Sequence, residues 1–189
     1  RVFTTVTDGK AGILELSCET DFVARNKDFV DLGNSIVEEM VASGKPATDP
    51  SFAEKVNEAI TTIKENMAIR RGEVMEMGAN ELVSDYIHGE SGRIGVLVKV
   101  IVDKAELRSN EAVKQFAFDV ALHVAAFRPT FLSIDSADPT YVGEQEEIFA
   151  AQAKALGKPE NVTKGIAAGK LKKHLGEICL VDQGFVKDE

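Results

Sequence analysis

The two cysteines and three histidines are the residues of this sequence whose side chains most often act as nucleophiles or metal ligands. Cys18 and Cys179 lie far apart and form no CxxC pair. The histidines, at positions 88, 123 and 174, form neither an HxH nor an HExxH pattern. Zinc needs several such ligands at defined spacing, and a nucleophilic thiol needs a neighbouring base. The pattern therefore predicts no metal site, and we expect Cys18 to be a packed thiol.

Two glycine-containing stretches resemble phosphate-binding loops but lack the required spacing. Residues 165–171, GIAAGKL, have three residues between the glycines where a P-loop has four, and leucine where magnesium needs a hydroxyl. Gly89, Gly92 and Gly95 precede a predicted strand, whereas a dinucleotide fingerprint opens a helix. We therefore expect no cofactor, and we interpret these three glycines as hairpin residues.

The stretch SCETDFVARNKDFV, residues 17–30, places a phenylalanine among acidic and amide side chains. Thr20 can cap a helix, and the negative charge of Asp21 suits the positive end of a helix dipole. On this pattern alone, Phe22 could be a core residue or a ring presented to another molecule.

The charge balance weighs against several classes of ligand. The 31 acidic and 22 basic residues give a net charge of -9, which repels nucleic acids and anionic lipids. The basic run at 170–174 is typical of a solvated helix end, although RNA contact stays an alternative. No run approaches the roughly 18 apolar residues of a membrane span, and two unpaired cysteines are typical of a reducing cytoplasm. Since the sequence begins at Arg1 inside a predicted strand, we expect further residues to precede it.

Turn residues and hydrophobic periodicity predict the elements that must position these side chains. Asp8-Gly9 suits a tight hairpin, and Gly44-Lys45-Pro46 ends a helix. In the first half we predict a hairpin at 1–17, a helix from Phe22 to Met40, a helix from Phe52 to Met67 and a strand at 68–78.

The same order of elements returns in the second half, which indicates an internal repeat. A hairpin is predicted at 81–102 and a helix at 110–127. A shift of 83 positions without a gap aligns Gly9 with Gly92, Gly12 with Gly95, Leu14 with Leu97, and Pro46 with Pro129. We therefore predict an α+β fold of two duplicated β-β-α-β subdomains, each an antiparallel sheet packed on helices.

Residues 141–175 have no counterpart in the first half. Two helical stretches joined by Gly157-Lys158-Pro159-Glu160 predict a helical hairpin, a coiled-coil insertion in the second subdomain. We expect a strand at 176–186 to close that subdomain. The predicted domains are an N-subdomain at 1–78, a C-subdomain at 79–140 and 176–189, and the insertion at 141–175.

TDFVARN, residues 20–26, resembles the signature of the translation elongation factor Ts family. Four further segments resemble the family in the same order, and together they span essentially the whole chain: NMAIRRGEV, YIHGESGRIGVLV, ALHVAAFRPTFL and GKLKKHLGEICLVDQGFV, beginning at residues 66, 86, 121 and 169. Members of the family also have a small helical N-terminal module and a further C-terminal segment. We expect both to be missing from this sequence, which matches the family's core or dimerisation region.

The resemblance implies a guanine-nucleotide exchange factor, not an enzyme, that binds elongation factor Tu and promotes GDP release during translation elongation. The aspartate and phenylalanine of the motif, here Asp21 and Phe22, would reach the GTPase domain, with the ring inserted near the magnesium and phosphate site. Arg25 and Asn26 also match the motif, and we expect them to contribute to partner binding or to hold its helix.

The resemblance also implies that the second subdomain contacts another domain of the partner. By motif position, the contact residues would be Ile94, Gly95 and His123. His123 occupies the repeat position of Met40, so that a core role for its side chain stays open.

Two other classes of protein stay open. An enzyme acting on a small molecule would need a pocket that converges on Cys18 or His123. An RNA- or ribosome-associated module without exchange activity would need a basic, aromatic surface. The sequence does not distinguish a bacterial from an organellar source, and homodimerisation and contacts of the 141–175 hairpin also stay open.

Overall fold

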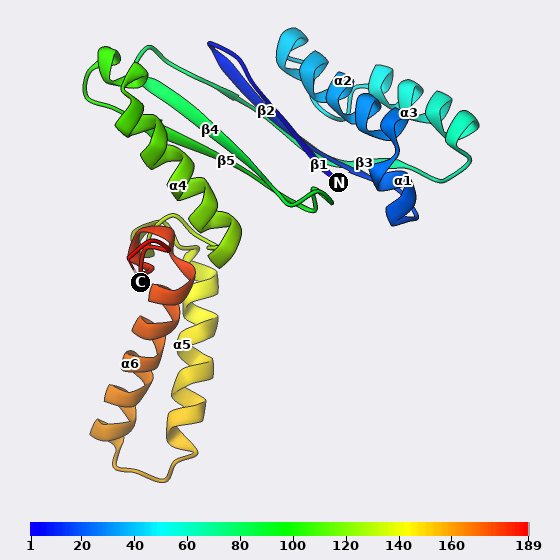
Figure 1. Cartoon of the computed structure of the whole chain (residues 1–189). Helices are drawn as coiled ribbons and strands as arrows, with labels where there is room; N and C mark the ends of the chain where they lie inside the picture. The colour runs from blue at the N-terminus through cyan, green and yellow to red at the C-terminus, as the bar shows by residue number, and fades with distance from the viewer. Residues whose placement is uncertain (189) are drawn as a thin grey trace. The chain divides into compact units, whose positions relative to one another are not determined.

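The computed structural model describes residues 1–188 and divides the chain into two compact units (Figure 1). The first unit spans Arg1–Ala125, and the second begins at Ala126. Antiparallel sheets packed on helices make up the first unit, which confirms the predicted α+β class.

The first sheet has three antiparallel strands in the order β1-β2-β3, with β2 in the centre. The strands are β1 (Val2–Val6), β2 (Lys10–Ser17) and β3 (Ala68–Glu76). The N–H of Thr7 donates to the carbonyl of Lys10 across the turn, over 2.8 Å. The predicted first hairpin and the predicted strand at 68–78 are thus confirmed.

Three helices connect β2 to β3, and the prediction of one continuous helix from Phe22 to Met40 is wrong. The helices are α1 (Asp21–Arg25), α2 (Lys27–Ser43) and α3 (Pro50–Ile63). Asn26 separates α1 from α2 because its backbone is extended, with ψ 138°, while its side-chain Oδ1 accepts from the N–H of Asp28 over 2.7 Å. The helix predicted to reach Met67 ends at Ile63, since Lys64 adopts a left-handed conformation with φ 66°.

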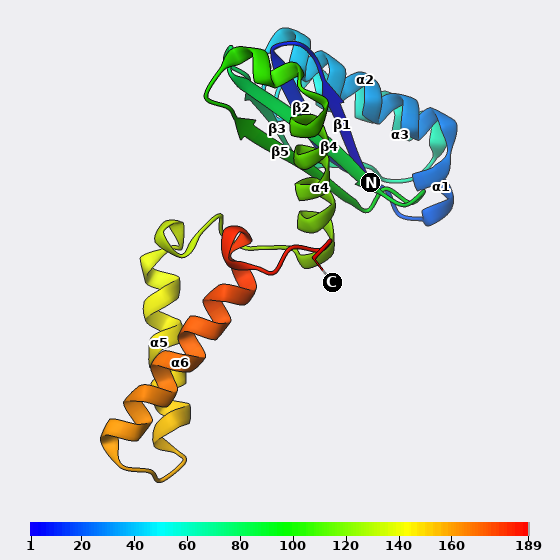
Figure 2. The same ribbon diagram turned by 60° about the vertical axis from the view of Figure 1, so that its left-hand side comes forward.

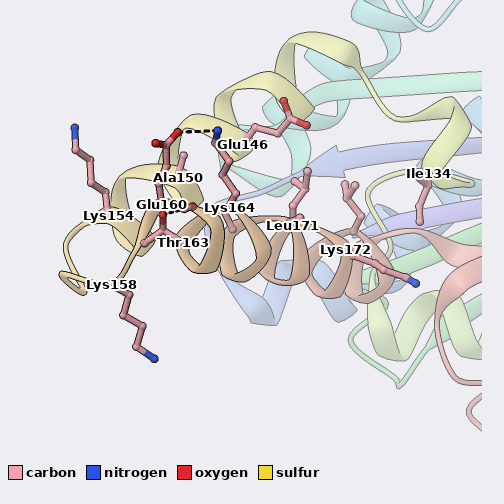
Figure 3. A pocket seen from close by; sticks show the side chains of 13 residues that line it. Ile134, Glu146, Ala150, Lys154, Lys158, Glu160, Thr163, Lys164, Leu171 and Lys172 are labelled. Carbon is pink, nitrogen blue, oxygen red and sulfur yellow. Dashed lines mark hydrogen bonds and ion pairs between the residues drawn. The ribbon is translucent and has the colours of Figure 1, made fainter.

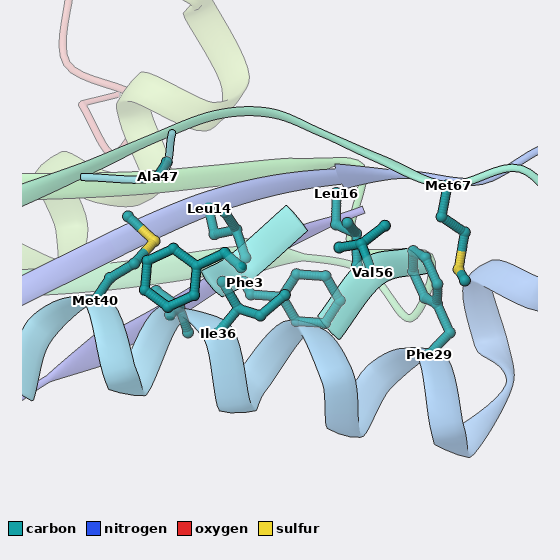
Figure 4. Packing of buried hydrophobic residues seen from close by; sticks show 11 residues of the cluster. Phe3, Leu14, Leu16, Phe29, Ile36, Met40, Ala47, Val56 and Met67 are labelled. Carbon is teal, nitrogen blue, oxygen red and sulfur yellow. The ribbon is translucent and has the colours of Figure 1, made fainter. Parts of the chain in front are cut away.

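The main core lies between the three-stranded sheet and helices α2 and α3, which cover one of its faces (Figures 1 and 4). Phe29 of α2 and Phe52 of α3 are completely buried, as are Leu14 and Leu16 of β2. Burying each such side chain contributes about 1.5 to 3 kcal/mol. The sequence analysis thus correctly predicts a sheet packed on helices in the first half.

The second sheet is a two-stranded hairpin of β4 (Glu81–His88) and β5 (Ile94–Ile101). Helix α4 (Glu111–Phe127) covers one of its faces, where Val96 packs against Ala121 and Ala125 (Figure 2). A 3-10 helix, η1 (Ala105–Ser109), precedes α4. The hairpin and helix predicted for the second half are thus confirmed.

The other face of the hairpin lies against β1 of the first sheet. The hydroxyl of Thr4 donates to Oδ2 of Asp85 over 2.7 Å, and the N–H of Val2 donates to the carbonyl of Gly92 over 2.7 Å. At Gly95 a Cβ would lie 2.3 Å from Cγ1 of Val2, so that only glycine fits between these strands without displacement.

Residues at equivalent positions of the repeat do not lie on the same face of their sheets. A Cβ at Gly12 would lie 2.5 Å from Cγ2 of Val41 in α2, whereas Gly95, its predicted equivalent, faces Val2 of β1. A one-residue change of register turns every strand residue to the opposite face. The gap-free shift of 83 positions therefore describes the order of the elements but not their packing.

The second unit contains the predicted helical hairpin. Its elements are η2 (Ile134–Ser136), α5 (Pro139–Lys154), α6 (Glu160–Ile178) and η3 (Leu180–Asp182). The strand predicted at 176–186 is wrong, because α6 continues to Ile178 and Cys179 forms a single parallel bridge with Phe131. Leu175 and Cys179 are both buried and lie four residues apart, a helical spacing that the short apolar run concealed.

Candidate functional site

Helix α1 is a short surface helix, all five residues of which are at least partly exposed. The hydroxyl of Thr20 accepts from the N–H of Val23 over 3.3 Å, which caps the helix as predicted. Asp21 lies in the first turn and Arg25 in the last, and their side chains form an ion pair at 3.5 Å. Both charges interact favourably with the helix dipole. An exposed ion pair of this kind contributes less than about 1 kcal/mol to stability.

Phe22 is the most exposed large apolar side chain among the residues that the structure describes, at 83%. The next residue, Val23, points the other way and packs against the main core. The chain therefore anchors α1 through Val23 and leaves the ring of Phe22 in solvent. Of the two alternatives that the sequence left open, the core position is wrong for Phe22.

Glu65, which follows α3, holds the amino-terminal end of α1. Its Oε2 accepts from the N–H groups of Thr20 and Glu19 at 3.0 and 3.2 Å, and its Oε1 accepts from the hydroxyl of Thr20 at 2.5 Å. One carboxylate thus satisfies three donors at the start of a helix, where backbone N–H groups lack intrahelical partners. These bonds connect α1 to the end of α3, 45 residues away.

The carboxyl-terminal end of α1 is held by Arg1 and Asn26. Nη1 of Arg1 donates to the carbonyl of Ala24 over 3.2 Å. The N–H of Asn26 donates to the carbonyl of Val23 over 2.9 Å, while the Asn26 side chain caps α2. A helix of five residues is not stable on its own, so these contacts at both ends fix the position of Phe22.

A polar cleft of about 210 Å³ lies beside α1 and includes Cys18, Asp21, Arg25 and Arg93 in its lining. The Cys18 thiol donates to the carbonyl of Thr20 over 3.3 Å. Burial raises the pKa of this thiol, and the nearby Glu65 carboxylate also raises it. Cys18 is therefore not activated as a nucleophile, because the thiolate is the reactive form.

Ile94 and Gly95 lie on β5, next to Arg93 of the cleft lining, and His123 lies on α4. Ile94 is partly buried on the face of the β4–β5 hairpin that packs against α4, whereas Gly95 lies on the opposite face, toward β1. His123 is 2% exposed, and Met40, at the equivalent repeat position, is also buried. The packing of His123 thus favours the core role that the sequence left open for this side chain.

Two larger cavities lie elsewhere. One of about 800 Å³ lies along β3 and the start of α3, and another of about 850 Å³ lies along the α5–α6 hairpin. Neither is lined by Cys18 or His123, which an enzyme site of the kind considered above would require. Within residues 1–188, no group of three or more His, Cys, Asp or Glu side chains is arranged to hold a metal ion.

Over the described part of the chain, none of the helices combines the length and the apolar character that a membrane crossing requires.

Glu65 and Arg1 are the residues of the site that the sequence analysis did not identify. Glu65 accepts hydrogen bonds from residues more than 40 positions away, and Arg1, which precedes β1, donates to Ala24, 23 positions along the chain. A contact of this kind depends on the tertiary fold and leaves no local pattern in the sequence.

Comparison with known proteins agrees with the motif. Residues 19–189 match a family model described as elongation factor TS. The chain is 48% identical to elongation factor Ts of Borrelia hermsii over 189 residues, which cover all of this chain and 68% of that protein. It is 47% identical to elongation factor Ts of Borreliella burgdorferi strain ZS7 over the same span, and 41% identical to that of Treponema denticola over 180 residues, 95% of this chain and 64% of that protein.

Proposed function

Because the chain belongs to the elongation factor Ts family, we propose that it is a guanine-nucleotide exchange factor that binds elongation factor Tu and promotes GDP release during translation elongation. The observation that supports this most directly is the exposure of Phe22 on a helix that is held at both ends. An apolar ring kept in solvent by its own fold is suited to enter a crevice of another protein.

In this proposal the ring of Phe22 inserts next to the magnesium and phosphate site of the GTPase, and Asp21 approaches the same region. Burying one phenylalanine contributes about 1.5 to 3 kcal/mol. Accelerating nucleotide release a thousandfold requires about 4 kcal/mol. Insertion of the ring therefore falls short by itself, and weakened coordination of the magnesium ion must supply the remainder.

The coupling between factor and nucleotide is reciprocal. A factor that weakens nucleotide binding is itself bound more weakly when nucleotide is present. Incoming GTP therefore promotes release of the factor. No covalent bond forms and no proton is transferred in this scheme, so the chain acts as a binding factor in the cytoplasm and not as an enzyme.

We assign Arg25 and Asn26 to holding α1 in place. Arg25 pairs with Asp21, and Asn26 ends α1 while capping α2. Both side chains are also exposed, which leaves them accessible to the partner at the edge of the interface.

A second contact with elongation factor Tu is proposed around Ile94, Gly95 and His123. Because His123 is buried, its contribution would come through the packing of α4, while Phe116 and Phe118 of the same helix are 54% and 39% exposed and offer apolar contact area. Two separate contacts are consistent with an interface of roughly 1,200 to 2,000 Å².

Release of labelled GDP from elongation factor Tu tests the proposal. We expect the chain to accelerate release and the Phe22→Ala variant to lose nearly all of this effect. Leu132→Ala, which also removes an exposed apolar side chain (63% exposed) but lies in the second unit, serves as the control and should retain full activity. Undiminished acceleration by Phe22→Ala would refute the insertion mechanism.

A further inference from the structure

The hairpin of α5 and α6 has an open groove along one side, which we name the arm groove (Figure 3). One stripe of each helix lines it: Glu146, Ala150 and Lys154 on α5, and residues from Glu160 to Leu175 on α6. Its volume is about 850 Å³. Residues four apart lie on the same face of a helix, so the groove follows the helix axes.

The floor of the arm groove is apolar and is made chiefly of small residues. Ala150 of α5 and Ala167 and Leu171 of α6 belong to its lining. Ile134 lies at one end of the groove (Figure 3). Of the residues that the structure describes in α5 and α6, Ala153 and Leu175 are the buried ones. Two helices cover each other on one side only, so the groove is where a third helix would complete the packing.

Lysines surround this floor. Lys154, Lys158 and Lys172 line the arm groove, and their side-chain ammonium groups form no ion pair or hydrogen bond with any described residue, whereas that of Lys164 pairs with Glu160 at 2.7 Å. Residues 154–173 contain six lysines and one glutamate, in a chain whose net charge is -9. The groove therefore combines an apolar floor with an excess of positive charge.

The chemistry of the groove favours a helix over a nucleic acid or an extended strand. Its described lining contains neither arginine nor an aromatic residue, the side chains on which RNA bases stack. Both walls are helices with internally paired backbones, and they offer no free edge for pairing with a strand. A helix with one apolar face and flanking carboxylates matches both the floor and the lysines.

We propose that the arm groove binds an acidic amphipathic helix of another protein. Its apolar face would lie on Ala150, Ala167 and Leu171, and its carboxylates would pair with Lys154 and Lys172. This inference goes beyond nucleotide exchange, because it involves neither α1 nor β5 and holds whether or not Phe22 acts as proposed.

The probe is a fluorescein-labelled model helix of about 18 residues, with leucine on one face and glutamate on both flanks. A second peptide with lysine in place of glutamate controls for charge, and oligo(U) tests for RNA binding. Binding to the full chain is measured by fluorescence anisotropy at two salt concentrations, about 50 and 500 mM.

Two pairs of variants separate the groove from the rest of the arm. Lys154→Glu with Lys172→Glu reverses charge inside the groove, and Lys170→Glu with Lys173→Glu makes the same charge change on α6 outside its lining. Ala150→Gln narrows the floor without altering a charge, and Ala151→Gln is its matched control. Circular dichroism checks that each variant keeps its helices.

We expect saturable binding of the acidic peptide. Lys154→Glu with Lys172→Glu should weaken this binding about tenfold or more, and so should Ala150→Gln. Either control should weaken it less than about twofold. We expect only a several-fold loss between the two salt concentrations, since the apolar contact is not screened. Equal loss in the control variants, equal binding of the lysine peptide, or absence of saturable binding up to about 0.2 mM would overturn the proposal. Tight oligo(U) binding that falls steeply with salt would instead make the arm groove an RNA site and would also overturn it.

Discussion

Glu65 offers a test of whether Phe22 must be held rigidly in order to act. Glu65→Ala removes the acceptor of three hydrogen bonds, from the N–H groups of Glu19 and Thr20 and from the Thr20 hydroxyl. A hydrogen bond contributes about 0.5 to 1.5 kcal/mol net, and these three lie at exposed positions, so that the lower values apply and their sum is about 1.5 to 3 kcal/mol. This energy stabilises the attachment of α1, since a helix of five residues cannot persist by itself.

We therefore expect Glu65→Ala to reduce exchange activity about tenfold or more while Phe22 remains present, because each 1.4 kcal/mol corresponds to a factor of about ten. Because these three bonds belong to the folded state and Glu65 lies outside the main core, the global free energy of unfolding should fall by no more than their sum, about 1.5 to 3 kcal/mol. GDP release and urea denaturation measure the two quantities. Glu58→Ala, an exposed glutamate on α3, is the matched control and should leave both unchanged.

Amide hydrogen exchange shows directly whether α1 has detached. The N–H groups of Val23 and Ala24 donate to the hydroxyl and carbonyl of Thr20, so their protection should fall in Glu65→Ala. If Glu65→Ala loses this protection but still accelerates GDP release fully, the view that a rigid α1 is required is refuted.

Three further changes probe the fold and the site. Phe52→Ala should lower the free energy of unfolding by about 3 to 5 kcal/mol in urea denaturation, because the ring is completely buried; a loss below about 1 kcal/mol would contradict this packing. Gly95→Ala should destabilise by about 1 to 3 kcal/mol, because its Cβ would lie 2.3 Å from Val2, and Val2→Ala should recover part of that loss; additive effects in the double variant would argue against the contact. Burial, aided by the Glu65 carboxylate, raises the pKa of Cys18, so iodoacetamide should react with it more slowly than with free cysteine near about pH 8, and a rate equal to that of free cysteine would be the contrary result. Since the folded state favours the protonated thiol, the associated stability is present below the ordinary thiol pKa and is lost as the pH rises through the raised value.

The order of strands and helices from β1 to α4 could be predicted, except for the break at Asn26, because local residues specify it. Turn glycines and helix-ending prolines recur in both halves, and they indicated the two hairpins and the helices that follow them. The break at Asn26 was missed because an asparagine that ends one helix and caps the next interrupts hydrophobic periodicity by a single residue. The orientation of Gly95 was also beyond the sequence, since a one-residue register change leaves the pattern of residue types intact.

The motif located the candidate site in the sequence but did not predict the contacts that hold it or the exposure of its side chains. TDFVARN indicated α1 and its Thr20 cap, yet the pattern did not decide whether Phe22 is buried or exposed. That depends on Val23, which packs against the core, and on Glu65, which approaches from another helix. The position of His123 was undecided for the same reason, because burial of a polar side chain in an apolar helix depends on what packs around it.

The β4–β5 hairpin does not form an independent structure. Two strands alone are marginally stable in water, and the core on the α4 side of this pair is small, formed by Val96 of β5 with Ala121 and Ala125 of α4. Its second face is completed by Val2 and Thr4 of the first sheet. During synthesis the first half can close its core before residue 81 leaves the ribosome, and the second hairpin then folds onto a surface that already exists. The order of the two halves along the chain is therefore also the order in which they can fold, and a fragment that lacks the first strand would leave the second sheet without its support.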